Sequence, residues 1–275
     1  MVENQEMNKR KFFIILLTFF IAFTTTAFVS KKAYSLYEAE GLYIVKINPN
    51  LTQIQPYVSE KLEIVYDIAK KTNASVAINT GFFDAKNKKT VSFIKTNDNR
   101  IFNPQDNENL ISNPNLEPHL DKIYNRGEFR LYNCNNKIVA DITYHHEPQK
   151  PDCTLLNSTQ AGPVILPQMD LEKEFFVTIE NGKVIRDGAG LTRKTHRSLV
   201  AIKDNFIYFI ITDQNAPLTI YELQQKLSKF KFEKALGFDG GGSVSLFVKD
   251  NGKEFYQCRE KEGASRPIKS ALIVY

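Results

Sequence analysis

The sequence contains no tryptophan and only three cysteines and four histidines among its 275 residues. None of the cysteines forms a CxxC pair, so the spacing of an ordinary zinc-binding cage is missing. The run of three glycines is not followed by Lys-Ser or Lys-Thr, which excludes a phosphate-binding loop of the Walker type. The net charge is only +5, and no block of Lys and Arg is dense enough to indicate nucleic-acid binding. The mild basicity that is left suits an anionic substrate weakly.

Apolar residues, by contrast, are plentiful. They make up 42% of the chain and include 20 phenylalanines and 12 tyrosines. That amount is enough for one large hydrophobic core or two small ones. No fixed-period repeat, low-complexity segment or interdomain linker stands out, so a single domain over residues 38–275 is predicted.

The N-terminus is not expected to belong to this domain. A basic start at residues 9–11 precedes an apolar run over residues 12–23, with small residues up to Ala27. This pattern predicts that residues 1–30 are a signal peptide or an uncleaved N-terminal anchor. The run is short for a stable span, which needs about 20 apolar residues, so cleavage after about Ala27 is favoured. A buried core helix is the alternative, and Lys31-Lys32 directly after the run argues against it. The domain is then exported, periplasmic or extracellular, and touches a membrane only through this segment if the segment is uncleaved.

An oxidising compartment permits a disulfide. Cys134 and Cys153 bracket a polar segment and are the preferred pair, which leaves Cys258 over; three unpaired thiols are the alternative. His145-His146-Glu147 resembles a set of metal ligands. Because adjacent residues point in opposite directions on a strand, a solvated loop is the favoured interpretation of this triplet.

Several apolar runs alternate with polar residues, as β-strands do. Strands are expected at residues 41–49 and 75–78, with a final strand near the C-terminus. Four further pairs of runs are joined by short turns typical of β-hairpins. These turns are Asn135-Asn136, Asn181-Gly182, Asp204-Asn205 and Asn251-Gly252.

Two helices are predicted. One covers residues 59–73 with Ser59 as its cap, and the other follows Thr219, which forms a capping box with Glu222. Residues 96–151 are polar and rich in Asn and Pro, and are expected to form a long excursion that contains one hairpin. Strands dominate, so the predicted fold class is α+β, with mixed, largely antiparallel sheets and a few packed helices.

The stretch KALGFDGGGSVSLFV places Asp239 directly before Gly240, Gly241 and Gly242. Glycines allow the backbone to approach a bound group, and their free N–H groups can hold anionic oxygens. Asp239 would add a carboxylate at the end of a strand. The alternative is a glycine-rich turn in which Asp239 is an ordinary turn residue.

Two other segments carry candidate ligands. In INTGFFD, Asn79 follows a strand, Gly81 makes a turn, and Phe82-Phe83 offer a stacking surface for a sugar ring. In TRKTHRSLVAI, Arg197 is the best phosphate ligand because a guanidinium binds phosphate with two parallel hydrogen bonds. The structural alternatives are that Asn79 only closes a turn, that Phe82 and Phe83 are a core pair, and that the basic cluster around Arg197 is a solvated face.

Taken in order, these segments resemble the phosphodiester glycosidase family. The resemblance rests on residues 79–83, 161–164, 197–202, 213, 218–223, 235–243 and 266–272. Gly237, Val244 and Thr80 depart from the usual family pattern.

The resemblance implies hydrolysis of the C–O bond between the anomeric carbon of a sugar and a phosphodiester. Asp239 would stabilise an oxocarbenium-like centre or activate water, and Asp213 and Glu222 are the further catalytic candidates. The implied substrate-binding residues are Asn79, Gly81, Phe82, Phe83, Arg197, Gly240, Gly241, Gly242, Ser243 and Arg266. The partner is a phosphorylated glycan or sugar phosphodiester. No cofactor is expected, although a divalent cation stays open.

A non-catalytic glycan- or cell-wall-binding module would share most of these features. The two functions differ in whether a second carboxylate faces Asp239 across the cleft.

Overall fold

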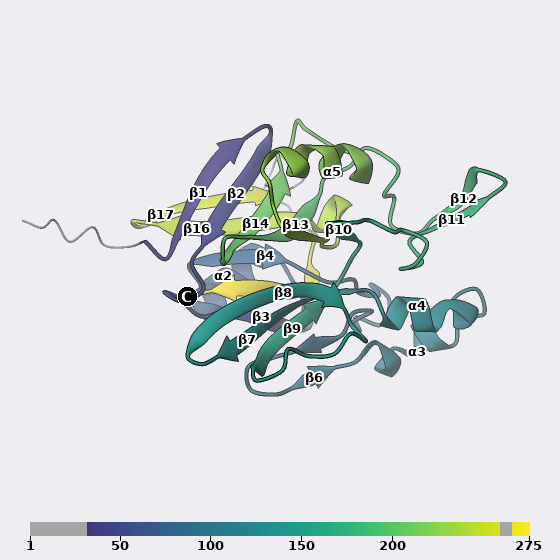
Figure 1. Cartoon of the computed structure of the whole chain (residues 1–275), viewed down its shortest axis with the longest axis horizontal. Coiled ribbons are helices and arrows are strands. Elements are labelled where there is room, and N and C mark those ends of the chain that lie inside the picture. Colours follow the sequence, from purple (N-terminus) through teal and green to yellow (C-terminus); the bar gives the residue numbers. More distant parts are fainter. Residues whose placement is uncertain (1–31, 259–265) are drawn as a thin grey trace, which may run out of the picture. The chain divides into compact units, whose positions relative to one another are not determined.

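The fold is built from antiparallel strands. The computed structural model describes residues 32–258 and 266–275. Every strand pairing within these residues is antiparallel, and residues 33–275 cluster as one compact unit. The predicted α+β class with largely antiparallel sheets and few helices is confirmed (Figure 1).

Three sheets and one separate hairpin account for the strands. The first sheet has the order β1 (Tyr34–Ala39), β2 (Leu42–Ile47), β14 (Phe206–Thr212), β13 (Ser198–Lys203), β15 (Lys234–Gly237), β10 (Val164–Leu166). The second has the order β17 (Lys253–Cys258), β16 (Ser245–Asp250), β4 (Val76–Asn79), β18 (Ile268–Val274), β3 (Ile54–Glu63). The third has the order β6 (Ile101–Phe102), β5 (Ile94–Lys95), β9 (Thr154–Gln160), β7 (Gly127–Cys134), β8 (Lys137–Tyr144). The hairpin of β11 (Val177–Glu180) and β12 (Lys183–Asp187) projects from the body at the right of Figure 1.

The helices are short and lie outside the sheets. They are α2 (Val65–Thr72), α3 (Glu108–Ile111), α4 (Leu120–Tyr124) and α5 (Ile220–Lys229), with 3-10 turns η1 (Pro104–Asp106), η2 (Glu117–His119) and η3 (Gly241–Ser243). The capping box of Thr219 and Glu222 that starts α5 is confirmed.

The main core lies where the sheets face one another. Strand β14 shows how alternation builds it: Phe209 and Ile211 join the core shared with β4, β7 and β18, whereas Tyr208 and Ile210 face the cluster under α5. Helix α2 covers the second sheet through Val65 and Ile68. The strand period of two therefore lets one strand serve two packing layers.

The helix predicted from Ser59 was placed too early. Strand β3 continues to Glu63, and α2 begins only at Val65 with Ile64 as its N-cap residue. Val58 and Glu63 pair with Ser270 and Ile268 of β18. Long-range strand pairing therefore overrides the local helix signal at these residues.

The predicted polar excursion is more ordered than a loop. It contains η1, α3, η2 and α4, and its strands β6, β7 and β8 belong to the third sheet together with β5 and β9. Asn103 and Asn107 cap η1 and α3 with their side chains, which explains why an Asn-rich segment becomes helical. A disulfide joins Cys134 to Cys153 beside the β7–β8 turn.

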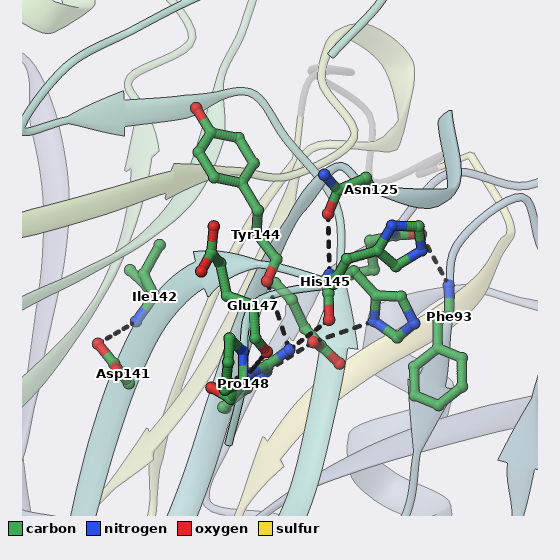
Figure 2. Close-up of polar contacts among 12 residues, drawn as sticks. Phe93, Asn125, Asp141, Ile142, Tyr144, His145, Glu147 and Pro148 are labelled. Atoms are coloured by element: carbon green, nitrogen blue, oxygen red, sulfur yellow. Dashed lines mark hydrogen bonds and ion pairs between the residues drawn. The ribbon is translucent and has the colours of Figure 1, made fainter. Parts of the chain in front are cut away.

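At the other end of that hairpin, a polar cluster holds the turn at residues 144–148 (Figure 2). Arg130 donates hydrogen bonds to four backbone carbonyls of this turn and pairs with Glu128 at 2.7 Å. His145 lies 3.1 Å from Glu128 and its ring is 4.5 Å from that of Phe93. The His145-His146-Glu147 triplet therefore lies in a turn with His146 and Glu147 exposed, as the loop interpretation expected, and Arg130 and Glu128 hold that turn in place.

The four turns predicted for the hairpins are confirmed, with left-handed backbone at Asn135, Asn181, Asp204 and Asn251. Within residues 32–258 and 266–275, no helix has the length and apolar character needed to cross a bilayer. The predicted N-terminal signal or anchor lies outside the described residues.

Candidate functional site

The candidate site forms where the first and second sheets meet. Asp239 follows β15 of the first sheet, and its N–H donates to the carbonyl of Thr80, just past the end of β4 (2.8 Å). Asn79 Nδ2 donates in turn to the Asp239 carbonyl (2.7 Å). Two strand ends that are 160 residues apart in the chain are thereby fixed against each other.

Each of two glycines in the run has a separate geometric reason. A Cβ on Gly240 would lie 3.0 Å from the His196 carbonyl oxygen, so a larger residue would push the loop off the start of β13. Gly241 has a φ of +61° and donates its N–H to the same carbonyl (2.9 Å). Within the described part of the chain, the N–H groups of Gly240 and Gly242 are in no backbone–backbone hydrogen bond. The Gly242 N–H is therefore open to an anion, whereas the Gly240 N–H already bonds the Asp239 carboxylate.

The Asp239 carboxylate is held in place by its own loop. Ser243, which is fully buried, donates its hydroxyl to Asp239 Oδ2 at 2.6 Å. Burial raises the pKa of Asp239 to about 6, and the Ser243 hydrogen bond, the Arg266 charge and the Gly240 N–H oppose that rise only in part. Asp239 is therefore a carboxyl group that titrates close to neutral pH, as a proton-transfer group should.

Arg266 is the cation that acts on this carboxylate. Its guanidinium lies over the Phe83 ring at 5.1 Å from the centroid, and the side chain is exposed. Its charge lowers the pKa of Asp239. Phe83 thus supports an arginine at the site, whereas the sequence predicted a stacking surface for a sugar.

Backbone carbonyls occupy most of the Arg197 guanidinium, so the phosphate contact predicted for it stays a prediction that concerns Nη1 alone. Its side chain is 4% exposed, and its Nε and Nη2 donate to the carbonyls of Leu218, Gly190, Leu191 and Arg193 at 2.7–3.0 Å. Burial lowers the pKa of Arg197 to about 10, and the charge of Asp187 only partly offsets this. The guanidinium does lie beside the glycine run, 3.8 Å from the point where a Gly240 Cβ would be. It acts as a clamp on the loop before β13.

Asn79 is also structural. It is fully buried, and besides bonding Asp239 it accepts the N–H of Ser245 at 3.1 Å. Both ends of its amide are used, so it positions Asp239 instead of contacting a sugar.

Asp213 and Glu222 are not brought to Asp239 by any contact among the described residues. Asp213 accepts the N–H of Asn215 (2.7 Å) and bonds the Tyr43 hydroxyl. Glu222 completes the helix cap and pairs with Lys194 at 3.1 Å. The predicted catalytic roles of these two acids are not supported, because local turn and cap contacts already occupy them.

The Gly81–Phe82 turn forms one wall beside the run. A Cβ on Gly81 would lie 2.6 Å from Ser92 Oγ, so this glycine is needed for close packing. Phe82 packs on Phe176 with 5.5 Å between centroids and lines a small enclosed cavity of about 10 Å³ with Arg197 and Gly240. The cavity is too small for a sugar ring.

Sequence reasoning missed one contributor to this site. Thr80 supplies the carbonyl that fixes Asp239, and its hydroxyl donates to Ser270 at 2.8 Å. Backbone carbonyls leave no residue-type signal in a sequence, so the partner of Asp239 could not be read from it.

A metal site is not evident in the described segments. No group of three or more His, Cys, Asp or Glu side chains within them is arranged to hold a metal ion.

Comparison with known proteins relates the whole arrangement to one family. A family model described as phosphodiester glycosidase matches residues 72–275, and no curated protein sequence matches. Among solved structures, the chain is similar to the zebrafish N-acetylglucosamine-1-phosphodiester alpha-N-acetylglucosaminidase catalytic domain auto-inhibited by its pro-peptide (TM-score 0.62, 13% identity, 90% of this chain and 85% of that chain). It is also similar to a putative exported protein from Burkholderia pseudomallei (TM-score 0.56, 12% identity, 85% and 73% of the two chains). These likenesses show the fold, and the family model covers most of the chain. The chain therefore belongs to the phosphodiester glycosidase family.

Proposed function

We propose that this domain hydrolyses the glycosidic C–O bond of a sugar-1-phosphodiester. Water adds its oxygen to the anomeric carbon, and the bonding electrons leave with the phosphodiester oxygen, which departs as a phosphomonoester. The observation that carries the proposal is the Asp239 carboxylate, held by Ser243 beside a glycine run and under the charge of Arg266.

Asp239 acts as the general base. Its pKa of about 6 leaves it mostly ionised at neutral pH, yet close enough to accept a proton from the attacking water. A phosphodiester is a good leaving group, so a second carboxylic acid is not required to protonate it. This agrees with the absence of a second carboxylate in contact with Asp239 among the described residues.

The departing phosphate meets positive charge and N–H donors. Arg266 is exposed and close enough to affect Asp239, and the N–H group of Gly242 is in no backbone–backbone hydrogen bond in the described chain. Such fixed donors stabilise developing negative charge without reorganisation.

The test is hydrolysis of a panel of sugar-1-phosphodiesters by the exported domain in water enriched in oxygen-18. C–O cleavage puts the label into the released sugar, whereas P–O cleavage puts it into the phosphomonoester. Label found only in phosphate would rule out a glycosidase mechanism. Asp204→Asn is the matched control for Asp239→Asn, because Asp204 is an exposed hairpin-turn acid.

A non-catalytic glycan-binding module is the second candidate, and the observation in its favour is that no second carboxylate contacts Asp239 among the described residues. It predicts saturable binding of a phosphorylated glycan with no release of sugar by the wild-type domain. Release that depends on Asp239 excludes it.

We further propose that the domain works outside the cytoplasm on a phosphorylated glycan or envelope polymer. The basic and apolar pattern before Ala27 and the Cys134–Cys153 disulfide support this. N-terminal sequencing of the secreted and membrane fractions tests it, and a soluble cytoplasmic protein with an intact Met1 would contradict it.

A further inference from the structure

Glu174 is a fully buried carboxylate that joins two of the sheets. It lies between β10 and β11 and has no exposed surface. Its Oε2 accepts the N–H of Gly127 at the start of β7, and its Oε1 accepts the N–H of Val164 at the start of β10, both at 2.8 Å. One side chain thereby ties the third sheet to the first.

The space for this carboxylate is made by a missing side chain. A Cβ on Gly162 would lie 2.6 Å from Glu174 Oε2, and Gly162 has a φ of +131° that other residues rarely adopt. Gly162 donates its N–H to the carbonyl of Gly237, and Gly237 donates back to the carbonyl of Pro163, both at 2.9 Å. Asp239 follows Gly237 by two residues, so the contacts of Glu174 lead directly to the strand that presents the catalytic candidate.

We propose that Glu174 is a positioning residue: its ionised carboxylate holds β10, and through Gly237 it holds the Asp239 loop in the arrangement that hydrolysis needs. The inference rests on the proposed function of Asp239.

The ionised form is required because both oxygens of Glu174 face N–H donors. A protonated carboxyl group would turn its O–H toward one of these donors and lose that hydrogen bond. Burial opposes ionisation and raises the pKa of Glu174 to about 7. The other charged or titratable groups that bear on it are Arg126 and Lys173, which lower its pKa, and Tyr144. These two hydrogen bonds, which together form a brace between the sheets, are therefore made and released near neutral pH.

The first test compares Glu174→Gln with the parent. A glutamine can accept one of the two N–H groups, but its NH₂ cannot accept the other. We expect kcat/KM at pH 8 to fall on the order of 100-fold, the loss that accompanies a displacement of about 1 Å at a reacting group. As pH decreases, Glu174 is protonated near pH 7 and Asp239 near pH 6, and each protonation should lower kcat/KM of the parent. Glu174→Gln should keep only the decrease near pH 6. The exposed Glu172→Gln, two residues away, should retain the parent profile.

The second test needs no variant and no activity. In the wild-type domain, the amide NMR signals of Gly127 and Val164 should titrate together with a midpoint near pH 7, and the Gly237 signal should follow them. Independent titration, or none between about pH 5 and 9, overturns the inference, as does a Glu174→Gln variant with the parent rate and the parent pH profile. If the signals titrate together but no diester is hydrolysed, the proposed function fails and the brace stands.

Discussion

Replacing Arg197 by lysine tests whether the Arg197 guanidinium stabilises the loop before β13 or binds phosphate. The guanidinium donates to four carbonyls, of Leu218, Gly190, Leu191 and Arg193, from a side chain that is 4% exposed. Hydrogen bonds from charged donors contribute about 1.5–3 kcal/mol each. Lysine keeps the charge but loses the planar fork, so we expect about two bonds to be lost and the free energy of unfolding to fall by about 3 kcal/mol.

A loss of about 3 kcal/mol corresponds to a decrease of about 6–12 °C in the melting temperature for a domain of this size. Differential scanning calorimetry of Arg197→Lys measures it, with the exposed Arg193→Lys as the control that should melt like the parent. Inhibition by inorganic phosphate is measured on the same samples. A melting temperature equal to that of the parent, together with weaker phosphate inhibition, would refute the clamp and restore Arg197 as a ligand.

Three further outcomes are expected. Asp239→Asn should fold with a melting temperature no lower than that of the parent, because the neutral form is favoured by burial, and should lose hydrolysis by at least about 100-fold; a folded variant with most of its rate would make Asp239 a turn residue. Between pH 5 and 8, the free energy of unfolding of the parent should fall by on the order of 3 kcal/mol relative to that of Glu174→Gln. The pKa of Glu174 in the folded state, about 7, exceeds the ordinary 4.5, so the folded state keeps the proton to higher pH and this stabilisation is lost as pH rises through 7. Equal urea midpoints at both pH values for the two proteins would contradict this. Reduction of the Cys134–Cys153 disulfide should lower the free energy of unfolding by about 3 kcal/mol, and an unchanged urea midpoint in reductant would show that the bridge contributes nothing.

Local signals were sufficient for much of the fold. The Asn-Gly and Asp-Asn turns fix hairpins because few residues adopt left-handed backbone, and Asn181 and Asp204 occupy those positions as predicted. The capping box at Thr219 and Glu222 was also visible in the sequence. Where a segment could satisfy two patterns, as at Ser59, the partner strand decided, and that partner lies more than 200 residues away.

The candidate site divides in the same way. The sequence by itself determined that a glycine run follows Asp239. The physical reason is that glycine tolerates the close approach of residue 240 to the His196 carbonyl and the positive φ of residue 241. Only the tertiary structure decided which charged residues serve it. Arg197 and Arg266 look alike in a sequence, but Arg197 is surrounded by carbonyls and Arg266 lies open beside Asp239. Glu174 gave no local signal at all, because its two N–H partners come from different sheets and exist as a pair only after folding.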